Sequence, residues 1–409
     1  MKPLNPGLSA LPTTIFTVMS ALAAEHGAIN LGQGFPDTEG PAELVAEAAR
    51  TLSDPDLGEA RNQYPPLTGL PVLREAVAAA NRRFHGLEID PAREVIVTSG
   101  ATEALAASLA ALVAPGDEVV VIEPLYDTYL PTLRLLGATP RLVRLEPPDW
   151  RLPVAALEAA FGPKTKALLF NSPMNPTGKV FTREELAVLA GLLERHDAYA
   201  VCDEVYEHLV FGAARHIPLM TLPGMRHRAI RIGSAGKTFS FTGWKVGYVT
   251  ADASLAPTIA KAHQNLTFTT APNLQRATAL GLGLDDAYFA QLAATLAARR
   301  DRLAAGLRAL GLDVLGCDGS YFLIADISAH LRPGEDDLAF CQRMTREARV
   351  TAIPLSAFYD GATSGLEGRC VRFAFCKRER VLDEAVSRLH AWLMPQTARP
   401  SLDAPASFP

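Results

Sequence analysis

The chain has 409 residues, of which 48% are hydrophobic and 20% charged, and its formal net charge is −5. This length predicts two domains with a large core, and the acidic balance gives no basic footprint for nucleic acid. No apolar run approaches the roughly 18 residues of a membrane span, and the proline-broken start lacks the apolar core of a signal peptide. Five cysteines without a CxxC pair are typical of reduced thiols, so we expect a cytoplasmic protein with no membrane or nucleic-acid partner.

Helical and strand patterns alternate along the middle of the chain. Helices are expected at 13–27, 41–52, 70–84, 103–113, 182–195, 253–264 and about 284–311, and strands at 95–98, 118–123, 138–145, 167–170, 198–202 and 229–232. The alternation predicts an α/β fold with a mostly parallel sheet, covered by helices on both faces and binding ligands at the carboxyl ends of its strands. Further strands at 321–325, 350–353 and 370–375 indicate a second, smaller α+β domain.

The stretch Ile230–Tyr248 contains the residues most suited to covalent chemistry. Lys237 is expected on the loop after a short strand, next to small residues and several aromatic ones. Burial there would lower the pKa of its amine, and a neutral amine can form a Schiff base with an aldehyde. Lys245 supplies a second cation for a phosphate, so the pair indicates pyridoxal phosphate. A P-loop is excluded because Arg231 stands where that motif requires glycine.

Small and polar residues also follow the other predicted strands. The turn Ser99–Thr102 precedes a helix, whose free backbone N–H groups can bind an anion. Asn175 lies in a loop that two prolines, Pro173 and Pro176, make rigid. Asp203 ends a strand, and Tyr206 lies three residues further on.

Two residues allow more than one interpretation. Tyr126 follows a strand and can stack on a flat ring or pack in the core. Arg372 is a cation inside an apolar strand, and it requires a carboxylate that comes from a ligand or from an internal salt bridge.

The motifs together resemble those of the fold-type I, pyridoxal-phosphate-dependent aminotransferases of class I/II, closest to the kynurenine/glutamine aminotransferases and the bacterial methionine aminotransferase-like enzymes. The matching stretches run in the family's order from about residue 13 to 390. They are NLGQGFPD (30–37), NQYPPLTG (62–69), TSGATEAL (98–105), EPLYDTY (123–129), NSPMNPTG (171–178), CDEVYEHL (202–209), SAGKTFSFTGWKVGY (234–248), GSYFL (319–323) and VRFAF (371–375).

The resemblance implies a large domain with a mostly parallel seven-stranded sheet between helices and a smaller α+β domain. Residues 1–40 would form an N-terminal arm and part of the small domain, 41–283 the large cofactor domain, 284–393 the small domain, and 394–409 a disordered tail.

The resemblance also implies a role for each matched residue. Lys237, Asp203 and Tyr206 would be catalytic: Lys237 bonds to the cofactor and moves the proton, Asp203 pairs with the pyridinium nitrogen, and Tyr206 and Asn175 contact the phenolic oxygen. Tyr126 would stack on the ring. The phosphate would be held by Gly100, Ala101, Thr102, Ser234 and Lys245, and by Tyr64 of the other subunit. The substrate would contact Arg372, Asn175, Gly34 and Phe16. Two positions vary from relatives: lysine stands at 245 where many have arginine, and tyrosine at 126 where the aromatic residue differs among them.

The implied activity is that of a homodimeric aminotransferase, which moves the amino group of a neutral amino acid to a 2-oxo acid by a ping-pong mechanism. No metal is implied. One alternative on the same cofactor is a β-lyase acting on cysteine or its S-conjugates. Another is a non-catalytic regulator that binds the cofactor; such a protein needs a DNA-binding domain, and only about 30 residues precede the NLGQG motif.

Overall fold

The computed structural model describes residues 2, 4–9, 11–57, 59–363 and 365–394. The predicted tail at 394–409 lies outside these residues except for Met394. Among the residues described, no helix is long and apolar enough to cross a membrane.

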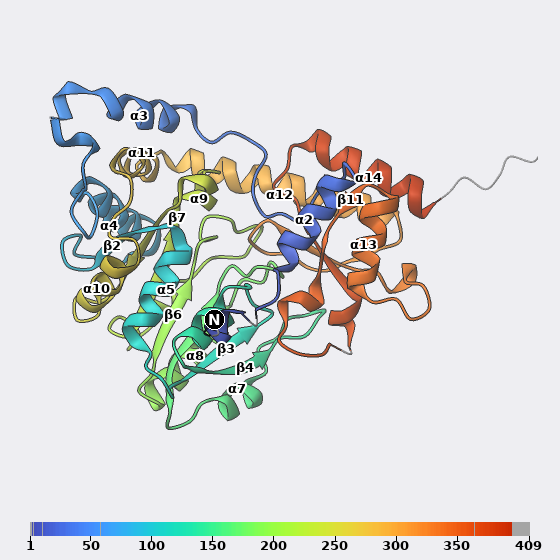
Figure 1. Cartoon of the computed structure of the whole chain (residues 1–409), viewed down its shortest axis with the longest axis horizontal. Helices are drawn as coiled ribbons and strands as arrows, with labels where there is room; N and C mark the ends of the chain where they lie inside the picture. Colours follow the sequence, from blue (N-terminus) through green and yellow to red (C-terminus); the bar gives the residue numbers. More distant parts are fainter. Residues whose placement is uncertain (1, 3, 10, 58, 364, 395–409) are drawn as a thin grey trace, which may run out of the picture.

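A large sheet forms the centre of the molecule, and a smaller sheet lies to one side of it (Figure 1). The large sheet has seven strands in the order β2-β8-β7-β6-β5-β3-β4. Their bounds are β2 Val95–Ser99, β3 Glu118–Glu123, β4 Thr139–Arg144, β5 Thr165–Asn171, β6 Tyr199–Asp203, β7 Ala229–Ser234 and β8 Val246–Thr250. Only β8 runs antiparallel to its neighbours. The prediction of a mostly parallel seven-stranded sheet is therefore confirmed.

The small sheet is antiparallel, with the order β12-β13-β10-β9. Its strands are β9 Asp313–Val314, β10 Phe322–Asp326, β12 Ile353–Pro354 and β13 Cys370–Ala374. A separate parallel pair joins β1 (Ile29–Asn30) to β11 (Val350–Thr351). The strand predicted at 350–353 is therefore two short strands that pair with different partners.

Helices cover the large sheet and connect it to the small one. They are α1 Pro6–Ser9, α2 Ile15–Glu25, α3 Ala42–Ser53, α4 Pro71–His85, α5 Gly100–Leu112, α6 Tyr129–Leu135, α7 Val154–Ala160, α8 Arg183–Arg195, α9 Ala235–Thr238, α10 Ala256–Leu266, α11 Pro272–Leu282, α12 Asp286–Ala309, α13 Asp337–Glu347 and α14 Glu379–Leu393. The long helix α12 extends from beside α11 to the small sheet, where it packs on α14 (Figure 1).

Helix α11 has no counterpart among the predicted helices, and neither do α6, α7, α13 and α14. Within α11, Gly281 permits close packing: a Cβ there would lie 2.7 Å from Leu44 of α3 and 2.9 Å from Phe239. Lys237 also differs from expectation, since it lies on the one-turn helix α9 rather than on a loop.

The start of α8 has the capping box expected from its sequence. The hydroxyl of Thr182 accepts from the Glu185 backbone N–H at 3.2 Å, and the Glu185 carboxylate accepts from the Thr182 N–H at 3.0 Å. These two bonds satisfy donors that a helix N-terminus otherwise leaves free.

We predict that Thr182→Ala lowers the free energy of unfolding by about 1 kcal/mol, because the cap is lost. Thr182→Ser keeps the hydroxyl and should unfold close to the wild type. Denaturant unfolding followed by circular dichroism compares the three proteins. Equal midpoints for the alanine and serine variants would show that the cap contributes nothing.

Candidate active site

A cavity of about 420 Å³ opens at the carboxyl ends of the large-sheet strands. Residues of the N-terminal segment, β10 and β13 complete its wall. The predicted site residues that line it are Phe16, Gly34, Gly100, Ala101, Thr102, Tyr126, Asn175, Asp203, Tyr206, Ser234, Lys237, Lys245 and Arg372. The fold thus brings together every predicted site residue except Tyr64.

Lys237 lies deep in this cavity, on α9 directly after β7. Its Nζ donates to the hydroxyl of Tyr321 at 3.1 Å, and that hydroxyl donates to the carbonyl of Gly34. The Nζ also lies 5.6 Å from the ring centre of Tyr206. Burial lowers the pKa of the Lys237 amine to about 8, against smaller opposing effects of Cys376 and Asp203. A substantial fraction of the amine is therefore neutral near physiological pH, as covalent bonding to an aldehyde requires.

Asp203 is the last residue of β6, is buried, and lines the same cavity. Burial raises the pKa of its carboxyl group, while a hydrogen bond from the Tyr129 hydroxyl at 2.5 Å opposes the rise. Its other oxygen has only a long contact of 3.5 Å with the Val205 N–H. A protonated ring nitrogen would give this carboxylate the positive partner that burial otherwise denies it.

Arg372 of β13 is 1% exposed. Its guanidinium donates to the Asn175 side chain at 2.7 Å and to the carbonyl of Gly32. Its Nε is buried without a hydrogen-bond partner, and no described carboxylate forms an ion pair with it. Arg372 therefore forms no internal salt bridge with any described residue.

Aromatic rings surround the same guanidinium. Its centre lies 4.0 Å from the ring of Phe322 and 5.2 Å from that of Phe16. Burial lowers the pKa of Arg372 to about 10, so the group remains charged at neutral pH. A buried cation with unused donors is suited to an anionic ligand group.

The other end of the cavity has the features of a phosphate site. Helix α5 begins there at Gly100, and its N-cap residue Ser99 makes no side-chain capping bond, so backbone N–H groups stay available. A Cβ added at Gly100 would lie 3.2 Å from the Nζ of Lys245, and the φ of Gly100 is +75°. Both facts require glycine at this turn, where the lysine amine comes close to the backbone.

The residues of the cavity fit pyridoxal phosphate by their chemistry. They offer an amine for the aldehyde, a buried carboxylate for the ring nitrogen, an aromatic side chain at Tyr126, and a helix N-terminus with a cation for the phosphate. Among the described residues, no group of three or more His, Cys, Asp or Glu is arranged to hold a metal ion.

Three further residues contact the site but were not among the predicted ones. Tyr321 and Tyr129 hydrogen-bond Lys237 and Asp203. Asp127 lines the cavity, and one of its carboxylate oxygens is buried without a partner. All three belong to the matched motifs GSYFL and EPLYDTY, so their place in these motifs could have marked them as site residues. Nothing in the sequence, however, specified which groups they contact.

Tyr64 lies apart from the cavity of its own chain. Its side chain is 80% exposed, and its ring centre is 5.1 Å from that of Phe268.

Comparisons with known proteins assign this architecture to a family. The family model for aminotransferases of class I and II matches residues 26–389. A probable N-succinyldiaminopimelate aminotransferase of Mycobacterium tuberculosis is 46% identical, over 92% of this chain and 95% of the relative. The methionine aminotransferase of Escherichia coli is 39% identical over 93% and 96%, and the mouse kynurenine–oxoglutarate transaminase 3 is 38% identical over 94% and 89%.

Solved structures agree with the sequence matches. The N-succinyldiaminopimelate aminotransferase of M. tuberculosis superimposes with a TM-score of 0.90 at 45% identity, covering 96% of this chain and all of that one. The E. coli methionine aminotransferase gives 0.89 at 39% identity, covering 95% and 99%. The succinyldiaminopimelate group was not among the relatives expected from the motifs.

We predict that the Lys237 amine reacts with an acylating reagent in the cofactor-free protein with a midpoint near pH 8. The neutral amine is the reactive form, and its fraction rises with pH through the pKa of about 8. Peptide mass spectrometry after brief treatment with acetic anhydride at each pH measures the reaction, with exposed Lys261 as internal reference. A midpoint above pH 10 would contradict the effect of burial.

Proposed function

This chain belongs to the class I and II aminotransferases, which use pyridoxal phosphate, and we propose that its amino donor is a neutral amino acid such as methionine, glutamine, or an aromatic or aliphatic one. A 2-oxo acid then takes up the amino group in the second half of a ping-pong cycle. The observation that carries the proposal is a buried arginine, Arg372, that has no carboxylate partner in the part of the chain that the structure describes; it lies at the aromatic end of a cavity that also contains Lys237.

The protein's own groups have distinct tasks in this proposal. Pyridoxal phosphate, when bound, supplies an aldehyde for the amino group and a ring that accepts electrons. Lys237 would hold the cofactor through its Nζ, and the same amine, when free, would take up and return the proton of the substrate as base and acid. Asp203 holds the ring nitrogen protonated, because an anionic carboxylate favours the positive form. Tyr206 and Asn175 supply hydrogen-bond donors for the phenolic oxygen.

The remaining contacts place the cofactor and the substrate. Tyr126 would pack against the ring of the cofactor. Gly100, Ala101, Thr102, Ser234 and Lys245 would bind its phosphate. Arg372 binds the substrate carboxylate beside Asn175 and Gly34, since its fork of donors suits two parallel hydrogen bonds.

Two features of the cavity favour a neutral substrate side chain. Phe16 and Phe322 give its Arg372 end an apolar wall. Arg372 is the only arginine among the described residues that line the cavity; the two lysines there, Lys237 and Lys245, are assigned to the cofactor, and Asp127 adds a carboxylate. An acidic side chain would therefore meet a like charge instead of a partner.

We also propose a homodimer with shared active sites. Tyr64 would reach the phosphate of the neighbouring subunit, which accounts for its exposure in a single chain. Large apolar residues are likewise exposed on α3, α4, α10 and α11, which lie together on one side of the molecule (Figure 1). These residues are Val45, Leu52, Val72, Leu266 and Leu280. A second copy of the chain would cover this surface.

The organisation proposed for the chain follows the predicted limits, with 41–283 as the large domain and 284–393, joined by 1–40, as the small one. The two separate sheets support this division. A cytoplasmic location is proposed as well, because all five cysteines are free and buried.

We predict that methionine, glutamine, kynurenine and leucine are better donors than aspartate or N-succinyldiaminopimelate, whose side chains carry carboxylates. A coupled assay with several 2-oxo acids gives kcat/KM for each donor, and release of ammonia and pyruvate is measured alongside. Arg372→Ala should reduce kcat/KM for all amino acids alike, roughly a hundredfold to several-thousandfold, since losing one partner of a buried pair costs about 3–5 kcal/mol.

Amines without a carboxylate provide the control, because they do not use Arg372 and should be hardly affected. If an acidic donor is the best substrate of the wild type, the neutral pocket is wrong. If Arg372→Ala impairs only some amino acids, the arginine recognises the side chain instead of the carboxylate.

We predict that Lys237→Ala and Tyr64→Ala subunits, each nearly inactive alone, regain activity when they are mixed and allowed to exchange. Each hybrid dimer contains one site with both native residues, so random exchange of equal amounts should give about a quarter of wild-type activity. Turnover before and after exchange measures this recovery, with each variant exchanged against itself as control. A mixture that stays inactive, or an active wild-type monomer by light scattering, would refute the shared site.

A further inference from the structure

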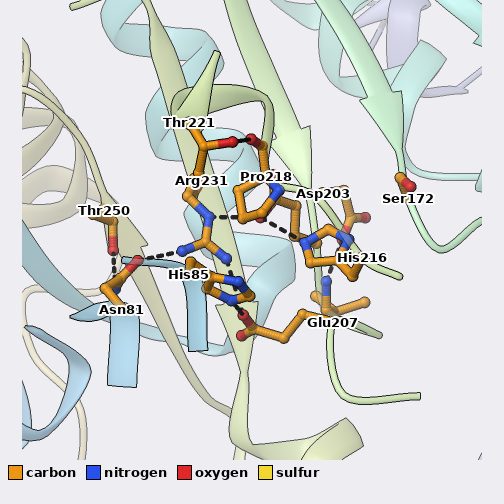
Figure 2. A network of polar contacts seen from close by, with 12 residues as sticks. Asn81, His85, Ser172, Asp203, Glu207, His216, Pro218, Thr221, Arg231 and Thr250 are labelled. Carbon is orange, nitrogen blue, oxygen red and sulfur yellow. Dashed lines mark hydrogen bonds and ion pairs between the residues drawn. The ribbon is translucent and has the colours of Figure 1, made fainter. Parts of the chain in front are cut away.

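A buried cluster of charged side chains lies behind the cavity, on the far side of the segment that carries Asp203 and Tyr206. Arg231 of β7 is at its centre (Figure 2). Its Nε donates to Glu204 at 2.6 Å and its Nη2 to Glu207 at 2.9 Å, while Nη1 donates to the side-chain oxygen of Asn81. His85 of α4 lies 2.8 Å from the second carboxylate of this set.

The members of the cluster are held in their charged forms by one another. Burial alone would raise the pKa of Glu204, but Arg231 and His216 hold it below its usual value. The pKa of Glu207 is likewise held well below its usual value, by Arg231 and His85. Arg231 is 5% exposed and Glu204 1%. The cluster is therefore an ionised network inside the protein, and none of the three charged side chains lines the cavity.

The segment from Asp203 to Glu207 has two faces with different tasks. Asp203 and Tyr206, three residues apart, line the cavity. Glu204 and Glu207, also three residues apart, point to Arg231. Strand β6 ends at Asp203, so the turn that follows has no strand ladder to hold it. One backbone bond, from the Glu204 N–H to the Ile232 carbonyl at 3.0 Å, ties the turn to β7.

Arg231 also belongs to the strand that places the lysine. It lies six residues before Lys237 on β7, beside Cys202 of β6 in the sheet register. A single guanidinium thus connects three elements: the turn after β6, the strand leading to Lys237, and helix α4 through Asn81.

We propose that Arg231 is a positioning residue, which sets the place of Asp203 and Tyr206 relative to Lys237 by binding Glu204 and Glu207 from behind. This inference rests on the proposed function, because it assumes that these three residues act on the cofactor. The fork of an arginine can bind both carboxylates at once, whereas the point charge of a lysine cannot. Glu204 and Glu207 hold the two ends of the turn, so their release lets Tyr206 move.

The test compares the wild type with Arg231→Lys, both loaded with cofactor. Borohydride reduction and peptide mapping of the wild type first establish that the cofactor is on Lys237. A label on another residue would refute the proposed function, and with it the premise of the role proposed for Arg231. With the label in place, kcat per loaded subunit should fall on the order of 10- to 100-fold in Arg231→Lys, because small misplacements of reacting groups are costly.

Two further readouts separate positioning from stability. The pH midpoint of the bound cofactor's absorbance should shift by at least about half a unit, since Asp203 and Tyr206 control its charge. The KM of the donor should change less than kcat, because Arg372 is untouched. Arg343→Lys is the matched control: Arg343 forms a similar two-bond pair with Glu335, at 2.6 and 2.8 Å, and does not line the cavity. Arg343→Lys should lower the melting temperature and leave kcat and the pH midpoint of the cofactor absorbance unchanged.

A second variant covers the case in which Arg231→Lys does not fold. Arg231→Met combined with Glu204→Gln and Glu207→Gln removes all three buried charges together, which proteins tolerate far better than removal of one. The same loss of kcat and the same shift of the absorbance midpoint are expected. If either folded variant retains wild-type kcat and midpoint and differs only in melting temperature, the network is structural and the proposal is overturned.

Discussion

Removal of water from Lys237, Asp203 and Arg372 is the constraint that the rest of the cavity must satisfy. Each of these side chains is most stable as an ion in water, and burial disfavours that ion. The pKa of the lysine is lowered to about 8 and that of the arginine to about 10, while that of the aspartate is raised. Nearby hydroxyls, amides and rings replace only part of the lost solvation. The cavity is therefore complementary to a ligand that brings its own opposite charges.

The end of the cavity that contains Arg372 depends on contacts between distant parts of the chain. Arg372 belongs to the small sheet, yet it bonds to Asn175 in the loop after β5 of the large sheet and to the backbone of the N-terminal segment at Gly32. Gly34 in that segment lies so close to β10 that a Cβ would be 2.5 Å from the ring of Phe322. Movement of one sheet relative to the other would change these contacts first. The carboxylate binding proposed for Arg372 therefore depends on how the two sheets are arranged.

The cluster around Arg231 shows how the same constraint extends beyond the cavity. A buried ion network is costly to desolvate and is weak support for stability in itself. Its geometry is specific, however, because a forked cation fixes the distance between two carboxylates. Glu204 and Glu207 are adjacent in the chain to Asp203 and Tyr206, the residues proposed to act on the cofactor. Fixing the two glutamates in place would therefore also fix the positions of these two neighbours. Stability and positioning can be measured separately here.

The sequence by itself determined the α/β order of elements, the capped start of α8, and the set of groups that follow strand ends. Those features depend on local periodicity and on residue chemistry, and parallel strands necessarily bring their carboxyl ends to one edge. Only the tertiary structure decided that Arg372 has no carboxylate partner among the described residues, that Tyr321 bonds Lys237, that Gly281 belongs to a helix, and that Arg231 joins three elements. These contacts join residues far apart in the chain, and their existence depends on packing distances that no local pattern contains.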